Sequence, residues 1–234
     1  MLYFAMAETK LLLLLVTRTT VWLGLMGVVM FLAAGDWAWP QGWAFIAIFV
    51  VGSVGFSLWL MRRDPALLAS RLTLNQKGTV GWDRVFLTVF IMIWFVWLAV
   101  MALDARRWQV SHMPLWLNVA GGVLIVLGFL ATMRVFLENS FAAPVVRVQE
   151  ERGQRVIDSG PYALVRHPMY AAALLYLIGM PFLLGSWIGL LFVPVYVAGM
   201  APRAMAEERL LARDLPGYAE YMRRVRRRLI PGLW

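Results

Sequence analysis

The chain has 234 residues, of which 62% are hydrophobic, and a formal net charge of +9. This composition excludes a soluble domain of average make-up. No cysteine and only two histidines are present, which excludes disulfides, thiol catalysis and a metal site built from several histidines. The positive charge fits a membrane protein better than a nucleic-acid partner, because basic residues gather in cytoplasmic loops and near anionic headgroups. We therefore expect an integral membrane protein with no metal and no nucleic-acid partner.

Residues 1–137 predict a region of four membrane spans. Apolar runs of about 20 residues, enough to cross roughly 30 Å of hydrocarbon, occupy 11–34, 43–61, 85–103 and 114–137. The first run continues beyond the length of a signal-peptide core and lacks a small-residue cleavage site, so we expect it to be retained. Between the second and third runs, Asp64-Pro65 has the pattern of a helix cap and first turn and predicts a short interfacial helix.

Residues 138–234 predict a second region with a different organisation. A long polar segment, 138–166, is followed by two shorter apolar runs, 169–184 and 187–200, joined only by Gly185-Ser186. So short a connection predicts an antiparallel helical hairpin, with kinks at Pro181 and Pro194. Beyond Pro202 the chain is still helical but too polar to span a membrane. The sequence of residues 214–217 predicts a break, after which a second helix begins with Asp214 as its cap.

Six spans place both termini on one side of the membrane. With the termini inside, all of the 22 Lys and Arg residues except Arg106 and Arg107 are cytoplasmic, as the positive-inside rule favours. In the C-terminal tail, apolar residues spaced by three and four define one helix face, and arginines occupy the other. We expect this basic helix to lie on anionic lipid headgroups. The apolar face comprises Leu211, Leu215, Tyr218, Met222 and Val225, and the basic face Arg223, Arg224, Arg226, Arg227 and Arg228.

The stretch 160–170, GPYALVRHPMY, combines a cation, an imidazole and a predicted helix start. His167 precedes a proline and must be largely extended, whereas Pro168 suits a first helical turn. Arg166 and His167 therefore lie at a helix N-terminus close to the membrane boundary. Such an arrangement favours the binding of an anion. Tyr162 of the same stretch offers a ring or a hydroxyl to a bound ligand.

A second cluster of charge, Arg203 to Glu208, follows directly after the last apolar run. Arg203 and Glu207 are four residues apart and share a helix face. Because a short hairpin separates this cluster from the 160–170 stretch, both return to the same side of the membrane.

Together these pieces carry a resemblance to a known family. The order GPYxxxRHPxY, an apolar hairpin, RxxxEExxL and YxxY resembles the isoprenylcysteine carboxyl methyltransferases. It is also similar to their wider group of membrane-embedded methyltransferases, which includes phospholipid N-methyltransferases. The resemblance covers about residues 154–231; where the family commonly has Phe-Gly, this chain has Leu215-Pro216-Gly217. The matching residues are Gly160, Tyr162, Arg166, His167, Pro168, Tyr170, Glu207, Glu208, Leu211, Tyr218 and Tyr221.

The resemblance implies that S-adenosylmethionine binds between the hairpin and the C-terminal helix, without a Rossmann domain. In agreement, no glycine-rich dinucleotide fingerprint is present. Arg203 then faces the methyl acceptor, and Arg166 suits the cofactor's carboxylate. The cofactor-contacting positions implied are Gln154, Arg155, Val156, Ile157, Tyr162, His167, Pro168, Met169, Tyr170 and Glu207.

Several functions remain open. The leading hypothesis is carboxyl O-methylation of an isoprenoid-like acceptor that enters from the bilayer, with Arg203 orienting its carboxylate. N-methylation of an amine lipid is the alternative and needs a base, for which Glu208 is the candidate. A sterol-reductase-like enzyme that binds a nicotinamide cofactor and a non-enzymatic transporter or scaffold are further alternatives. Against a transporter, we expect no buried acidic residue within a span, because the aspartates lie at span ends. These are Asp36, Asp64, Asp83 and Asp104.

Overall fold

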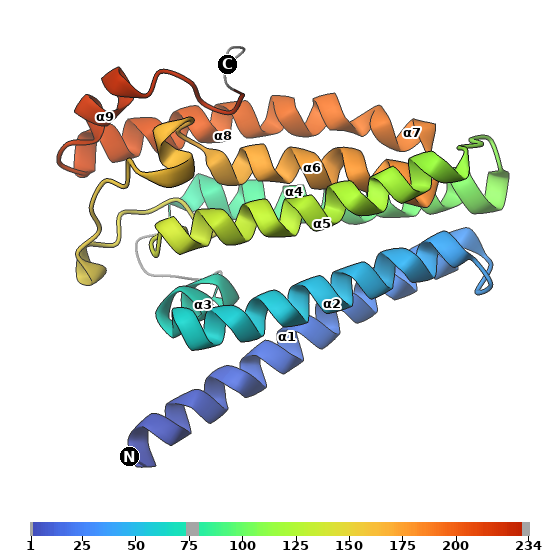
Figure 1. Ribbon diagram of the computed structural model, residues 1–234, viewed down its shortest axis with the longest axis horizontal. Helices are drawn as coiled ribbons and strands as arrows, with labels where there is room; N and C mark the ends of the chain where they lie inside the picture. Colours follow the sequence, from blue (N-terminus) through green and yellow to red (C-terminus); the bar gives the residue numbers. More distant parts are fainter. Residues whose placement is uncertain (1, 74–79, 231–234) are drawn as a thin grey trace.

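The computed structural model describes residues 2–73 and 80–230, and all regular secondary structure within them is helical (Figure 1). Five helices are long and apolar enough to cross a membrane, and a sixth apolar helix has 17 residues. Many large apolar side chains on these helices face outward, such as Val51 and Val85. Side chains of this kind are stable on the surface when lipid surrounds them. The described helices are therefore those of a multi-pass membrane protein, as predicted.

The first four spans correspond to the predicted ones, although the helix of the first begins at Leu2, well before the predicted start at residue 11. They are α1 (Leu2–Ala34), α2 (Pro40–Arg63), α4 (Gly81–Ala102) and α5 (Leu115–Glu138). A π-helical segment, η1 (Leu103–Trp108), continues α4 into what the sequence predicts as a loop. The predicted interfacial helix is α3 (Pro65–Leu72), and the Asp64 side chain caps it by accepting a hydrogen bond from the Leu67 amide at 2.9 Å.

The C-terminal region contains the predicted hairpin. Its first arm is α6 (Pro168–Leu184), which ends at Gly185 with a φ of +86°, a conformation that favours glycine. The return arm is interrupted at Leu191, so that α7 (Trp187–Leu190) precedes α8 (Phe192–Asp214). The last helix is α9 (Tyr218–Arg224).

The structure corrects two details of the tail. Asp214 is the final residue of α8 and not the cap of α9, which begins after Gly217, whose φ is +84°. Only two of the five arginines assigned to the basic face lie in α9, because the helix ends at Arg224 and an extended segment follows. Tyr218 and Leu215 of the predicted apolar face are buried in one cluster, which also contains Tyr221.

The helices form a closely packed bundle in which α4, α5, α6 and α8 are neighbours and α1 and α2 lie along one side (Figure 1). The most intimate contact is between α5 and α6. A Cβ atom built on Gly121 of α5 would lie 2.2 Å from the backbone nitrogen of Leu183 and 2.6 Å from the carbonyl oxygen of Gly179. Small residues thus let the two helix backbones touch, as is common in membrane proteins.

Two of the aspartates that the sequence places at span ends are buried, one in the first turn of α4 and one in η1. Asp83 and Asp104 have no accessible surface. Asp83 forms an ion pair with Arg203 of α8. Asp104 accepts hydrogen bonds from the Ser111 and Ser186 hydroxyls at 2.6 and 2.5 Å. Hydrogen-bond partners engage both oxygens of Asp83 and Oδ2 of Asp104, which offsets much of the cost of burial, whereas Asp104 Oδ1 has no hydrogen-bond partner among the described residues.

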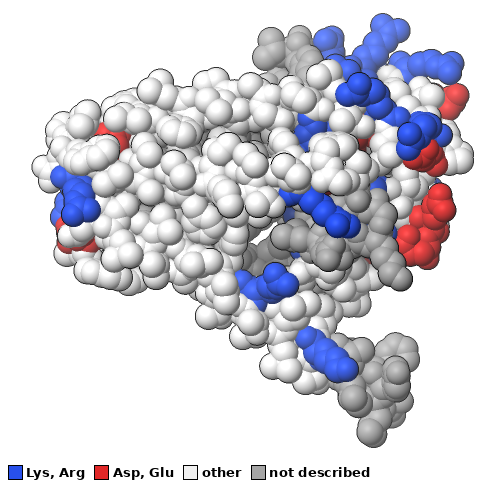
Figure 2. Space-filling view, turned by 180° about the vertical axis from the view of Figure 1, so that it is seen from behind, with Lys and Arg blue, Asp and Glu red and all other residues white. Residues whose placement is uncertain are grey.

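Charge is distributed unequally between the two ends of the bundle. Most of the Lys and Arg side chains visible in Figure 2 gather at one end, opposite the short α1–α2 and α6–α7 connections. That end also carries α3, α9 and the irregular segment between α5 and α6.

Candidate functional site

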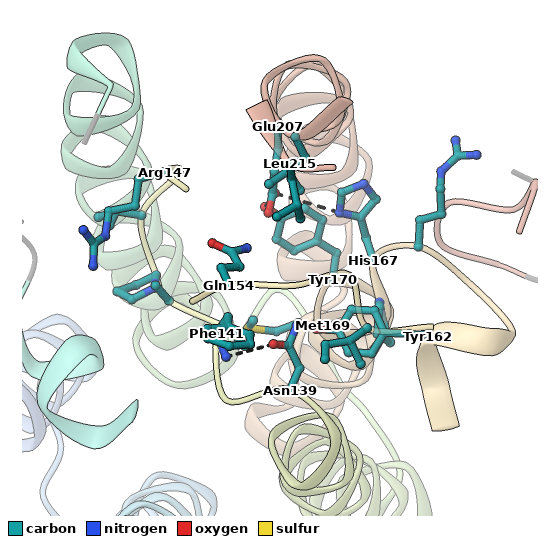
Figure 3. Close-up of a pocket in the computed structure, with 18 of the residues that line it drawn as sticks. Asn139, Phe141, Arg147, Gln154, Tyr162, His167, Met169, Tyr170, Glu207 and Leu215 are labelled. Atoms are coloured by element: carbon teal, nitrogen blue, oxygen red, sulfur yellow. Dashed lines mark hydrogen bonds and ion pairs between the residues drawn. The ribbon is translucent and has the colours of Figure 1, made fainter. Parts of the chain in front are cut away.

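A pocket of about 310 Å³ opens at the basic end of the bundle (Figure 3). It is enclosed by α3, the segment between α5 and α6, the first turn of α6, and the polar half of α8. In Figure 3, His167, Tyr170 and Glu207 meet on one side, and Asn139 and Phe141 lie across from them. The pocket brings together every position predicted to contact a cofactor, and Arg203. These are Gln154, Arg155, Val156, Ile157, Tyr162, Arg166, His167, Pro168, Met169, Tyr170 and Glu207.

The start of α6 has the conformation that the sequence predicts. His167 has φ −121° and ψ 64°, and Pro168 is the first residue of the helix. The Tyr170 ring stacks on the His167 ring with a centroid distance of 5.2 Å and an angle of 3° between the planes. Backbone hydrogen bonds from Arg166 and His167 to the carbonyls of Arg227 and Arg228, both 2.9 Å, fix this turn against the C-terminal segment.

Glu208 lies outside the pocket and ties α8 to its surroundings. One of its oxygens accepts hydrogen bonds from Arg166 Nε at 2.6 Å and from His167 Nε2 at 3.1 Å, and the other accepts one from Arg228 Nε at 3.0 Å. The prediction of Glu208 as a candidate base does not fit this geometry. A carboxylate that two guanidinium groups hold in a buried ion-pair cluster is not free to accept a proton from a ligand.

Arg166 lines the pocket, but its Nε and Nη1 are already engaged by protein acceptors. Besides Glu208, it donates to the Val225 carbonyl at 3.1 Å and approaches the carbonyls of Met222 and Arg226 at 3.5 and 3.4 Å. Arg166 therefore holds the segment after α9 in place. This arrangement does not support its predicted contact with the cofactor's carboxylate.

Arg203 and Glu207 are linked through a tyrosine and form no direct ion pair. The Tyr170 hydroxyl donates to Glu207 Oε2 at 2.8 Å and accepts a hydrogen bond from Arg203 Nη1. Arg203 also pairs with Asp83, with Nε 2.9 Å from Oδ1, and donates to the Pro144 carbonyl at 2.9 Å. The Glu207 side chain remains 29% exposed, so part of it faces the pocket.

Tyr162 is held as a structural wall of the pocket. Its hydroxyl accepts a hydrogen bond from Asn139 Nδ2 at 2.8 Å, and its carbonyl accepts one from the Tyr221 hydroxyl at 2.9 Å. Burial raises the pKa of the Tyr162 hydroxyl, which therefore stays neutral at physiological pH. Its ring, rather than its hydroxyl, is the part available to a ligand.

A second, apolar cavity of about 280 Å³ adjoins the first between the spans. Aromatic side chains dominate its lining, among them Phe49, Phe90 and Trp94. Tyr170, Ala173 and Met200 line both cavities. The sequence carries no visible signal for this cavity, because its lining comes from six helices, α1, α2, α4, α5, α6 and α8, spread over most of the chain.

Other lining residues were also missed from the sequence, notably Arg71, Asn139 and Phe141. They lie on α3 and just after α5, outside the stretch that carries the family resemblance. Their neighbours in sequence give no reason to single them out.

Comparison with known proteins agrees with these observations. The family model described as phospholipid methyltransferase matches residues 116–216, which contain α5, the pocket-forming segment and the hairpin. The predicted resemblance to the membrane-embedded methyltransferases is confirmed. The structure of the eukaryotic intramembrane Ras methyltransferase, isoprenylcysteine carboxyl methyltransferase, has a similar fold, with a TM-score of 0.52 and 18% identity over 96% of this chain and 82% of that one.

A curated relative comes from Cupriavidus metallidurans (strain ATCC 43123 / DSM 2839 / NBRC 102507 / CH34) and is called cobalt-zinc-cadmium resistance protein CzcN. The two sequences are 30% identical over 103 residues, which are 44% of this chain and 47% of the relative. The match thus spans about half the length of that relative. Within residues 2–73 and 80–230, no three His, Asp or Glu side chains are grouped so as to hold a metal ion.

Proposed function

We propose that the protein is an S-adenosylmethionine-dependent methyltransferase that acts at the membrane on a lipophilic acceptor. The observation that carries the proposal is the adjacency of two cavities. A pocket lined by the H-P-x-Y turn of α6 and by Glu207 of α8 shares Tyr170, Ala173 and Met200 with an apolar cavity between the spans. One cavity suits a polar cofactor and the other an apolar chain, and the reacting groups would meet at the shared wall.

The residues of the polar pocket fit the cofactor's chemistry. Its volume of about 310 Å³ lies at the lower end of the range found for ligand pockets, roughly 300–1,000 Å³. Glu207 offers a partly exposed carboxylate for an amino group or ribose hydroxyls. Apolar surface for the cofactor's adenine ring comes from four other residues of the lining, Val156, Ile157, Leu211 and Leu215. When bound, S-adenosylmethionine supplies an electrophilic methyl group on a sulfonium cation.

The chain's own residues then have distinct roles. The stacked rings of His167 and Tyr170 present aromatic surface, which attracts a cation by about 0.5–2 kcal/mol. The Tyr170 hydroxyl fixes Glu207 by donating to it. The apolar cavity excludes water around the acceptor, so that alignment and desolvation lower the barrier.

Carboxyl O-methylation of an isoprenoid-like acceptor is the reaction that the pocket supports best. A carboxylate is already a nucleophile at neutral pH and needs no base. Among the described residues, Glu207 is the acidic side chain that lines the pocket. The family match favours a second candidate, N-methylation of an amine lipid. That reaction requires removal of an ammonium proton, and Glu207 rather than Glu208 would have to accept it.

We further propose that the pocket opens to the cytoplasm, with both termini inside, and that the basic end contacts anionic headgroups. The asymmetry of Lys and Arg in Figure 2 supports this orientation. Labelling of cysteines introduced at Trp187 and Ser159, which are exposed at opposite ends of the bundle, tests it. In intact cells an impermeant reagent should label the cysteine at position 187 and leave the one at position 159 unlabelled until the membrane is opened. Labelling at position 159 alone in intact cells would reverse the orientation.

Calorimetry of the detergent-purified protein tests cofactor use. S-adenosylhomocysteine should bind saturably, and Glu207→Gln should weaken it, whereas Glu151→Gln, an exposed position outside the pocket, should not. No binding to the wild type at millimolar ligand would refute the proposed function. A methyl-transfer screen over isoprenoid acids, prenylated thiols, fatty acids and amine lipids then identifies the acceptor.

A further inference from the structure

Arg71 is held at the pocket by the packing of the short helix α3. The Asp64 cap and Pro65 start this helix, and its residues Leu67 and Leu68 are buried in a cluster with Phe136 of α5. One face of α3 is thus anchored in the bundle. Arg71, one residue before the end of the helix, lines the pocket.

The guanidinium of Arg71 is only partly satisfied by protein groups. Its Nη1 donates to the Ala142 carbonyl at 2.9 Å and lies 3.8 Å from Met169 Sδ, and the group lies 4.7 Å above the Phe136 ring. For Nε and Nη2, the described residues supply no acceptor. An arginine has five N–H donors in a fixed fork that matches a carboxylate, so this side of the fork remains available to a ligand.

Arg71 is half-buried and differs from the two buried arginines of the pocket, Arg166 and Arg203, in its ion pairing. Arg166 is paired with Glu208 at 2.6 Å, and Arg203 with Asp83 at 2.9 Å. Arg71 forms no ion pair with any carboxylate of the described residues, and the nearby charge of Arg203 repels it. Burial lowers the pKa of Arg71 to about 10, which still leaves it charged at neutral pH. A half-buried cation that lines a pocket and has no counter-charge favours a ligand that supplies one.

We propose that Arg71 is an anion-binding residue of this pocket and receives a carboxylate of a bound ligand. The inference deepens the proposed function and rests on it for the identity of that ligand. Two carboxylates are available under that function: the one at the methionine end of the cofactor and the one on the acceptor. Arg166, the residue predicted from sequence for the first of these, is already neutralised by Glu208.

Binding measurements on Arg71→Gln and Arg71→Lys separate the two sources. If the cofactor supplies the carboxylate, Arg71→Gln should weaken S-adenosylhomocysteine at least about tenfold and leave 5′-methylthioadenosine, which lacks the amino-acid end, unchanged. If the acceptor supplies it, the same variant should weaken farnesoic acid but neither methyl farnesoate nor S-adenosylhomocysteine. Arg71→Lys should retain part of the affinity in either case. Arg63→Gln, an exposed arginine at the end of α2, is the matched control.

A folded Arg71→Gln protein that binds all four ligands within about twofold of the wild type overturns the proposal. Thermal unfolding without ligand establishes that the variant is folded, and Arg71→Lys provides the comparison if Arg71→Gln is not. Wild-type protein that binds neither adenosyl compound refutes the proposed function instead. In that event the pair farnesoic acid and methyl farnesoate decides on Arg71 alone, and equal binding of both by the wild type counts against it.

Discussion

Neutralising Asp83 should destabilise the protein strongly. Asp83 has no accessible surface, and Arg203, its partner on α8, is 7% exposed. Asp83 Oδ1 accepts from Arg203 Nε at 2.9 Å, and Oδ2 accepts from the Val146 amide at 2.7 Å. Asp83→Asn keeps the shape of the side chain but removes its charge. It also turns one oxygen into an NH₂ group, which must face either the Arg203 donors or the Val146 donor.

The expected cost follows from what remains buried. Removing one partner of a buried ion pair typically costs about 3–5 kcal/mol, because the other charge is left uncompensated. Arg203 retains only the Pro144 carbonyl and the Tyr170 hydroxyl as acceptors. We therefore expect Asp83→Asn to lower the free energy of unfolding by about 3 kcal/mol or more. The double variant Asp83→Asn/Arg203→Met should lose about 1–3 kcal/mol less free energy of unfolding than the sum of the losses of the two single variants.

Equilibrium unfolding in mixed detergent micelles, followed by the fluorescence of the 12 tryptophans, measures these energies. Asp214→Asn is the control, since Asp214 pairs with Arg213 at the surface and should leave unfolding nearly unchanged. The reasoning is refuted if Asp83→Asn unfolds like the wild type. Strict additivity of Asp83→Asn and Arg203→Met would equally show that the pair is not coupled.

Three further predictions concern packing, the tail and the pocket. Gly121→Leu should prevent close approach of α5 and α6 and abolish a monodisperse folded fraction in size-exclusion chromatography, whereas Gly24→Leu, with no atom within 4 Å of its Cβ, should not. Glu208→Gln should release the segment after α9 and accelerate trypsin cleavage there; an unchanged cleavage rate would contradict its role as a clamp. Tyr170→Phe removes the donor that fixes Glu207 and should weaken S-adenosylhomocysteine several-fold in calorimetry, and unaltered affinity would show that this hydrogen bond is dispensable.

The elements that the sequence predicted well depend on local physics. Apolar runs of the right length gave the spans, because a membrane helix must satisfy its backbone internally and face lipid with apolar side chains. His167-Pro168 marked the start of α6, since proline restricts the residue before it and suits the first turn. Gly185-Ser186 marked the hairpin, because two residues leave no other connection.

The errors arose where distant segments meet. Asp83 lies at the end of a span as predicted, but its burial and its partner Arg203, which is 120 residues away, were not predicted. Glu207 and Glu208 are adjacent in sequence, and successive residues of an α-helix point about 100° apart. One therefore lines the pocket while the other faces Arg166, and no local pattern distinguishes them. Arg71 was missed for the same reason, since only the fold brings α3 beside the pocket.

The pairing of Arg203 with Asp83 bears directly on the chemistry proposed for Arg203. A guanidinium that binds an acceptor carboxylate tightly lowers its nucleophilicity, so an unpaired Arg203 would oppose the reaction that it serves. Because Asp83 already neutralises much of its charge, Arg203 can orient an acceptor through a remaining donor without holding it as a full ion pair. Arg71 has no such partner and suits a carboxylate that is to be held rather than consumed. Of the two sources proposed for its ligand, this contrast favours the carboxylate of the cofactor.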